Sequence, residues 1–259
     1  MSVIKAEHLT IGFSKHKPIL QNLNFKAHKN DFICLMGANG VGKSTLLKTI
    51  CGLLPKLSGK ILIKNTNIID FNKNDLAKNI SILLTRHEAE IPLKVWDLVA
   101  LGRAPYTNMW GGLTEIDLKV VRESLKMANL ESLKDSFYHE LSDGQKQKVL
   151  LARALAQNTP VMLFDEPNSF LDISHKMELI RIFSCIRHNS DKTIIFSTHD
   201  WELALDMAHT IWAISNDGKL LISTPEDFIL SRKIETYFEL NEGRFDYDKG
   251  RFFYNSFSH

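Results

Sequence analysis

The sequence holds little cysteine, and its few cysteines are scattered. The three of them, Cys34, Cys51 and Cys185, stand far apart in apolar surroundings, and no CxxC pair occurs. This spacing argues against a zinc site or a disulfide framework and is typical of reduced core cysteines in a cytosolic protein. No apolar run approaches ~18 residues, so we expect no membrane-spanning helix. Any action at a membrane would therefore require a partner.

The chain also lacks a marked excess of charge. Its 32 basic and 30 acidic residues leave a formal net charge of +2. That balance does not indicate the basic surface by which proteins bind nucleic acid. A signal peptide is not expected either, because charged residues interrupt the opening stretch MSVIKAEHLTIGF. The length of 259 residues fits one large or two modest domains with a proper core.

Short apolar runs alternate with helical patterns along most of the chain. The runs predict buried strands of a largely parallel sheet at 31–37, 80–84, 161–165, 193–199 and 210–215. Helices are predicted at 43–54, 174–188 and 201–208. The alternation of the two is typical of an α/β fold.

Two parts of the chain depart from this alternation. The segment 87–158 holds no strong strand pattern, and Thr114 followed by Asp117 is a helix-capping pattern, so we interpret it as a helical insert. The tail begins with TPEDFIL, which predicts a capped helix, and continues with FDYDKGRFFY, which predicts a hairpin. A simple surface cover is the favoured interpretation of that tail.

The stretch GANGVGKST fits the pattern of a phosphate-binding loop, G-x-x-x-x-G-K-[ST], between a predicted strand and a predicted helix. Its glycines let backbone N–H groups surround phosphate oxygens, and the helix start adds a positive dipole end. Lys43 is expected to reach the β- and γ-phosphates, and the Ser44 hydroxyl to bind Mg²⁺. The predicted contacts with the nucleotide are Gly37, Ala38, Asn39, Gly40, Val41, Gly42, Lys43, Ser44 and Thr45.

Two acidic residues follow the apolar run of VMLFDEP. Open α/β sheets place ligand chemistry at this end of their strands. Asp165 is therefore a candidate for holding Mg²⁺, and Glu166 for polarising the attacking water as general base. An ordinary acidic turn is the alternative.

His199 ends the run TIIFSTHD and so points to the same edge of the predicted sheet. A histidine there can contact the γ-phosphate and stabilise the transition state. A purely structural histidine is an equally weighted alternative.

Taken together, these motifs resemble the ATP-binding subunits of ABC transporters, over about residues 3–230. LSDGQ, with Ser142, Gly144 and Gln145, is similar to the family signature, SFLD with Asp172 to its D-loop, and Phe13 stands at its adenine-stacking position. The resemblance implies a P-loop ATPase fold with an antiparallel β part at the N-terminus. It also implies a head-to-tail dimer, in which the signature of each subunit binds ATP held by the other.

The resemblance further implies how the chain is organised. The whole of 1–259 is one ATPase domain, with a nucleotide-binding core at 1–86 and 159–230, a helical signature subdomain at 87–158 and an extension at 231–259. The stretch VWDLVALGRAPYTNMWGGL is most similar to importers of iron–siderophores, haem or cobalamin. Expected partners are a separate polytopic permease and, indirectly, a substrate-binding protein, with the chain peripheral at the cytoplasmic face of the membrane.

Two positions depart from the family pattern. Arg86, or Thr85 if the alignment shifts by one, stands where the family has a Mg²⁺-binding glutamine, and a guanidinium has no lone pair to offer a cation. Asp143 replaces the first glycine of the signature, and we expect its side chain to point away from the nucleotide. These departures suggest one alternative function, a weakly hydrolysing, ATP-dependent dimerisation switch. An exporter ATPase is the other alternative, because separate ATPase chains also occur among exporters.

Overall fold

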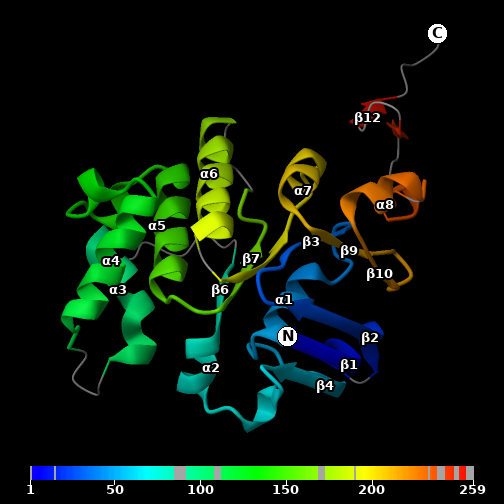
Figure 1. Cartoon of the computed structure of the whole chain (residues 1–259), viewed down its shortest axis with the longest axis horizontal. Helices are drawn as coiled ribbons and strands as arrows, with labels where there is room; N and C mark the ends of the chain where they lie inside the picture. Colours follow the sequence, from blue (N-terminus) through cyan, green and yellow to red (C-terminus); the bar gives the residue numbers. More distant parts are fainter. Residues whose placement is uncertain are drawn as a thin grey trace. The chain divides into compact units, whose positions relative to one another are not determined.

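The computed structural model describes residues 2–14, 16–84, 92–107, 112–168, 173–189, 191–232, 234–237, 243–247 and 251–254. The chain divides into two compact units (Figure 1). The first combines Met1–Asn67 with Thr193–His259, and the second is Ile68–Lys192. Within the described ranges, no helix combines the length and the apolar character that crossing a membrane requires.

The first unit opens with an antiparallel sheet. Its strands are β1 (Ser2–Ser14), β2 (Lys17–His28), β4 (Ser58–Ile63) and β5 (Thr66–Asn67), in the order β2-β1-β4-β5. All neighbouring pairs run antiparallel. Along β2 buried and exposed residues alternate, as expected of a sheet with one face on the core. The antiparallel N-terminal part inferred from the sequence is confirmed.

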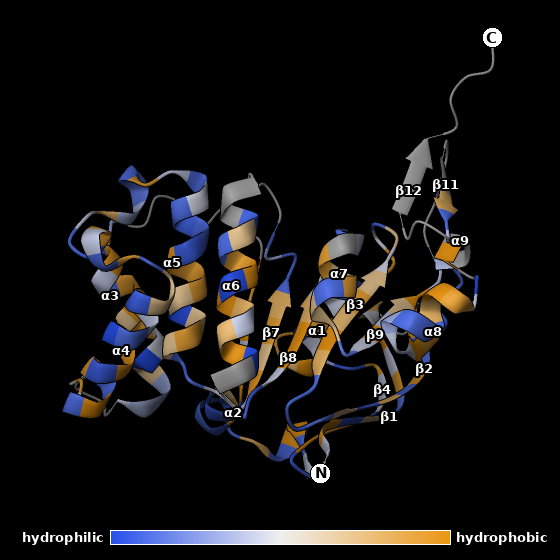
Figure 2. Ribbon diagram, turned by 45° about the horizontal axis from the view of Figure 1, so that its top comes forward, coloured by the Kyte–Doolittle hydropathy of each residue, from blue (hydrophilic) through white to orange (hydrophobic). Residues whose placement is uncertain are grey.

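The same unit holds a second, mostly parallel set of strands. They are β3 (Phe32–Gly37), β8 (Thr193–Ser197), β9 (Thr210–Ile214) and β10 (Leu220–Ser223), in the order β10-β9-β3-β8. β3 runs parallel to β8 and β9, and β10 is antiparallel to β9. Figure 2 shows β3 and β9 mostly in the colour of apolar residues, which is typical of strands buried on both faces.

The helices of this unit follow the strands. They are α1 (Lys43–Ile50), α7 (Trp201–Met207), α8 (Pro225–Leu230) and α9 (Ile234–Tyr237). α1 ends four residues before the predicted limit of 54 because Gly52, with φ of 77°, turns the chain out of the helix. The predicted terminal hairpin is confirmed as β11 (Gly243–Asp246) paired with β12 (Arg251–Tyr254).

The second unit is mainly helical. Its helices are α2 (Lys73–Asn79), α3 (Val95–Ala100), α4 (Glu115–Met127), α5 (Asp143–Ala156) and α6 (Ile173–Asn189). Short 3₁₀ turns lie at Ile68–Asp70, Leu101–Tyr106, Glu131–Leu133 and Tyr138–Glu140. Its two strands, β6 (Ile80–Leu83) and β7 (Val161–Asp165), pair in parallel. α3, α4 and α5 pack together, green in Figure 1.

The helices α3, α4 and α5 all fall inside the predicted helical segment, whose described residues carry no strand. Its limits of 87 and 158 stay a prediction. The cysteines agree with the sequence analysis: all three are free, and Cys34 and Cys51 are buried. Burial raises the pKa of the Cys34 thiol well above its ordinary value and that of Cys51 to about 11.

Candidate functional site

The predicted phosphate loop leaves β3 and enters α1 through a turn that requires glycine. Gly37 and Gly42 have φ of 146° and 113°. A Cβ on Gly37 would lie 2.6 Å from the backbone oxygen of Ile214, and one on Gly42 would lie 2.7 Å from Cγ2 of Ile19. Both the backbone angles and the close neighbours therefore exclude larger residues here. The spacing of the motif thus has a direct structural cause.

Lys43 is held inside this loop. Its side chain is buried, at 5% exposure, and its Nζ donates to the carbonyl oxygens of Gly37 at 2.8 Å and Ala38 at 2.9 Å. α1 begins at the same residue, since Leu46 N donates to Gly42 O at 2.8 Å. A positive group at the start of a helix, beside a glycine turn, is suited to binding phosphate.

Several other predicted nucleotide contacts in this unit are at least partly accessible to solvent. Ser44 and Thr45, in the first turn of α1, are half-buried, and Asn39 is exposed. Phe13, on β1, is 79% exposed although it is aromatic. An exposed ring suits the predicted stacking on adenine, which stays a prediction.

His199 lies at the same edge as the phosphate loop. β3 and β8 are parallel with Leu35 opposite Ser197, so Gly37 and His199 each stand two residues beyond that pair. The histidine is exposed, and its neighbour Asp200 caps α7 by accepting from Leu203 N at 3.1 Å. The structure therefore brings these two predicted elements of the site together, as parallel-strand topology requires.

Asp165 and Glu166 lie in the second unit, at the end of β7. Asp165 is buried, and Glu166 adopts φ of 49°, a left-handed conformation that is costly for a residue other than glycine. The following turn is fixed from α5, because Gln147 Nε2 donates to Pro167 O at 3.3 Å. Such stored strain is concentrated at functional sites, which fits the role predicted for Glu166.

The signature stretch forms the start of α5. Ser142 Oγ accepts from Gln145 N at 3.3 Å, and Gln145 Oε1 accepts from Ser142 N at 3.0 Å, which completes a capping box. Asp143 is exposed in the first turn, where a negative charge is favourable to the helix dipole, and Gly144 is half-buried. A hydroxyl that accepts can still donate, so this cap is compatible with Ser142 binding a phosphate oxygen.

The residues suit Mg²⁺ by the nature of their donor atoms. Mg²⁺ binds oxygen ligands, usually one or two from the protein together with waters and substrate phosphates. Ser44 supplies a hydroxyl and Asp165 a carboxylate. A group of three or more His, Cys, Asp or Glu side chains that could hold a metal is not found among the described residues.

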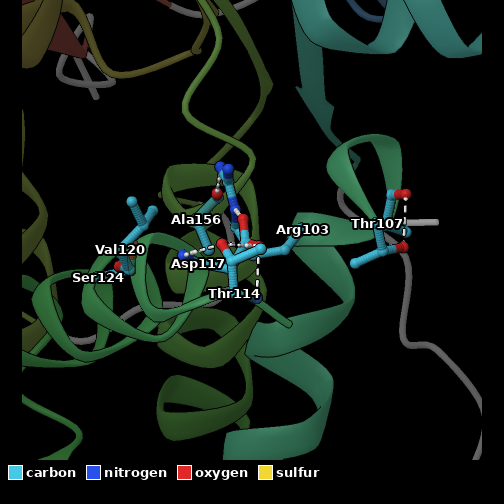
Figure 3. Close-up of polar contacts among 8 residues, drawn as sticks. Arg103, Thr107, Thr114, Asp117, Val120, Ser124 and Ala156 are labelled. Atoms are coloured by element: carbon cyan, nitrogen blue, oxygen red, sulfur yellow. Dashed lines mark hydrogen bonds and ion pairs between the residues drawn. The ribbon is translucent and has the colours of Figure 1, made fainter. Parts of the chain in front are cut away.

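The sequence analysis missed a buried polar network in the second unit (Figure 3). Arg103 and Asp117 are buried, and Arg103 Nε donates to Asp117 Oδ1 at 2.9 Å while its Nη1 donates to Ala156 O at 2.8 Å. The guanidinium also lies 3.9 Å from the ring centre of Tyr106. Hydrogen bonds from Thr114, then from Arg103, lower the pKa of Asp117. The network links the end of α5 and the start of α4 to the 3₁₀ turn at Leu101–Tyr106.

Several predicted residues lie outside the described parts of the chain. These are Asp172 with the whole SFLD stretch, and Thr85 and Arg86. Their roles stay predictions. Asp143 is described, but whether it points away from a nucleotide is likewise not established.

We expect Lys43→Ala to weaken binding of MgATP by roughly 10- to 100-fold, because a hydrogen bond to a charged group contributes about 1.5–3 kcal/mol. Titration with a fluorescent ATP analogue would measure the change. Lys48→Ala is the matched control, since Lys48 is a partly exposed lysine in the last turn of α1. Equal affinities for the two variants would contradict the role assigned to Lys43.

Comparisons with known proteins add independent evidence. Residues 20–169 match the family model described as ABC transporter. An uncharacterised ABC transporter ATP-binding protein of Methanocaldococcus jannaschii is 35% identical, over 94% of this chain and 83% of that protein. A probable siderophore transport system ATP-binding protein of Bacillus subtilis is 32% identical, over 93% and 87%.

Two solved structures resemble the structure of this chain. A metal-chelate type ABC transporter in an inward-facing conformation has a TM-score of 0.79 at 24% identity, covering 98% of this chain and 96% of that one. A dimeric ATP-binding cassette in a post-hydrolysis state, bound to ADP and Pi, has a TM-score of 0.75 at 26% identity, over 86% and 98%.

Proposed function

Because this chain belongs to the ABC transporter family of ATP-binding proteins, we propose that it is the subunit that binds and hydrolyses ATP to power an importer. The observation that carries this proposal is the phosphate loop. Its Lys43 is buried and hydrogen-bonded to loop carbonyls, and a Cβ on Gly37 or Gly42 would clash with neighbouring atoms. The similarity to a siderophore transport protein supports an iron–siderophore as the imported substrate, and haem and cobalamin are the alternatives within the same importer group.

The proposed chemistry assigns one task to each group. Lys43 and the N–H groups of the loop neutralise the β- and γ-phosphate charge, and Phe13 stacks on the adenine. Ser44 and Asp165 would hold Mg²⁺, which supplies charge neutralisation between the phosphates when bound. Glu166 polarises the attacking water as general base.

His199 completes the proposed reaction. Its position at the strand edge beside the phosphate loop supports a contact with the γ-phosphate, where it stabilises the charge of the transition state.

The signature stretch is proposed to serve a second copy of the chain. Ser142 and the N–H of Gly144, at the start of α5, would bind ATP held by the phosphate loop of a partner subunit, with Gln145 closing the cap. The similarity to a dimeric cassette bound to ADP and Pi supports a dimer of this chain, for which we propose the head-to-tail arrangement. ATP then joins the two subunits, and hydrolysis releases them.

The remaining partners follow from the importer proposal. A separate polytopic permease would anchor the chain peripherally at the cytoplasmic face of the membrane, and a substrate-binding protein would act through that permease. The helical segment 87–158 is proposed as the signature subdomain of a single ATPase domain. Its partly exposed Tyr106 supports a contact with the permease, because aromatic residues are enriched at interfaces.

Affinity purification of the tagged chain from gently solubilised membranes, with phosphate release measured on the product, tests this function. Co-purification of a polytopic permease without a large soluble domain, together with turnover, is the expected result. A partner with an extended periplasmic domain would favour an exporter. ATP-induced dimerisation with almost no phosphate release would favour the switch, and Arg86→Gln should then raise turnover sharply.

A further inference from the structure

Phe245, in the C-terminal hairpin, packs against other aromatic residues of the first unit. In β11, Phe245 is opposite Phe252 of β12, and its side chain is only 3% exposed. Its ring lies 5.3 Å from that of Trp201, centre to centre, in an edge-on arrangement with an interplanar angle of 76°. Such an edge-on contact is favourable beyond the burial of the two rings, because the positive edge of one ring faces the negative face of the other.

Trp201 also packs against an aromatic residue of α8. It is 4% exposed, and its ring centre lies 5.6 Å from that of Phe228 on α8. Phe228 in turn meets Tyr237 of α9 at 5.4 Å. Figure 2 shows α8, α9 and β11 gathered in one region. Phe228, Tyr237 and Phe245 thus form one aromatic cluster with Trp201.

Trp201 is also the first residue of α7, two positions after His199. The backbone before the histidine is fixed by the pairing of Ser197 with Leu35, and Asp200 N donates to Thr198 Oγ1 at 2.9 Å. After it, the backbone is fixed by the cap of α7 and by the packing of Trp201. These backbone anchors, on both sides of His199, therefore contribute to where its exposed ring lies.

We propose that Trp201 and Phe245 are positioning residues for His199, so that the C-terminal hairpin sets the rate of ATP hydrolysis without contacting the nucleotide. The inference rests on the proposed function, because it takes His199 as the group that stabilises the γ-phosphate. It gives the C-terminal extension a role beyond that of a surface cover. The phosphate loop is anchored independently by β3 and α1, so its affinity for ATP is expected to be unaffected.

The test is Phe245→Ala in the full chain. We expect kcat for ATP hydrolysis to fall about 10- to 100-fold, because small misplacements of catalytic groups are costly, while KM and nucleotide affinity stay within about twofold. Phe245→Leu, which keeps an apolar side chain in the cluster, should recover most of the rate. If Phe245→Ala fails to fold, Phe245→Leu and Trp201→Phe give the same comparison with smaller changes.

Two controls separate positioning from general destabilisation. Ile63→Ala removes a fully buried side chain from β4 in the antiparallel sheet and should cost comparable stability, yet leave kcat unchanged. In a His199→Ala background, adding Phe245→Ala should cause no further loss of rate, because the two residues act through one group.

The outcomes distinguish this inference from the function on which it rests. If the intact chain shows no ATP hydrolysis, the proposed function itself fails. If the chain hydrolyses ATP and its kcat depends on His199, but Phe245→Ala keeps the kcat of the intact chain, the inference alone is overturned. Additive losses in the His199→Ala background would overturn it too, as would an equal fall in kcat for Ile63→Ala.

Discussion

Glu166→Gln is expected to slow ATP hydrolysis by about 10²–10⁴-fold while leaving ATP affinity within a few fold, because the amide keeps the shape of the side chain but cannot act as a base. The left-handed turn at Glu166 fixes where this side chain leaves β7. Phosphate release under steady-state conditions measures the rate, and equilibrium titration measures the affinity. The variant should also accumulate as an ATP-bound dimer, since binding persists and release depends on hydrolysis.

The matched control for this experiment is Glu131→Gln, which neutralises an exposed glutamate of the same unit. Its rate should equal that of the intact chain. Near-normal turnover in Glu166→Gln would remove Glu166 as general base and leave the water to be activated by another group. A loss of ATP affinity equal to the loss of rate would instead indicate a binding role.

Arg103→Met is expected to lower the free energy of unfolding by about 3–5 kcal/mol, because it leaves the buried carboxylate of Asp117 without its cation. It also removes the donor to Ala156 O at the end of α5. Urea denaturation monitored by circular dichroism would measure the change. In the intact chain Thr114 and Arg103 lower the folded-state pKa of Asp117 below its ordinary value of 3.8, so the stability that they contribute is fully present above pH 3.8 and is lost as the pH falls through the lowered pKa.

The exposed pair of Lys119 and Glu123, 3.9 Å apart on α4, provides the control. Glu123→Gln should change the free energy of unfolding by less than about 1 kcal/mol, because solvent already screens that pair. The double variant Arg103→Met with Asp117→Asn should be less destabilised than Arg103→Met alone, since no buried charge is left. A single variant as stable as the control would show that the buried pair contributes nothing.

The parts of the fold that could be predicted are those encoded locally. The strand before Gly37, the glycine spacing and the helix after Lys43 lie within one short stretch, so a single pattern contains the whole element. The parallel pairing of β3 with β8 then places His199 at the edge expected from strand topology. The length of α1 was overestimated, because the sequence pattern continues apolar past Gly52 whereas the backbone turns there.

The contacts that could not be predicted join distant residues. The sequence marks Thr114 and Asp117 as a capping pair, and Asp117 Oδ2 indeed accepts from Thr114 N. Nothing local indicates that Asp117 Oδ1 accepts a hydrogen bond from Arg103 Nε. Trp201 and Phe245 likewise belong to separate patterns, a helix and a hairpin. Side-chain packing between such elements follows from the assembled fold, and periodicity within each element carries no information about it.

The hydrogen bonds of Lys43 have a consequence for how the phosphate loop exchanges its ligand. Its ammonium group is already bound by the carbonyl oxygens of Gly37 and Ala38, so these oxygens act as resident competitors for an incoming phosphate. Affinity for the nucleotide is then a difference between two sets of hydrogen bonds, and a leaving phosphate is replaced at once by the chain itself. A buried cation whose charge the chain itself compensates therefore binds phosphate less tightly than a bare one would.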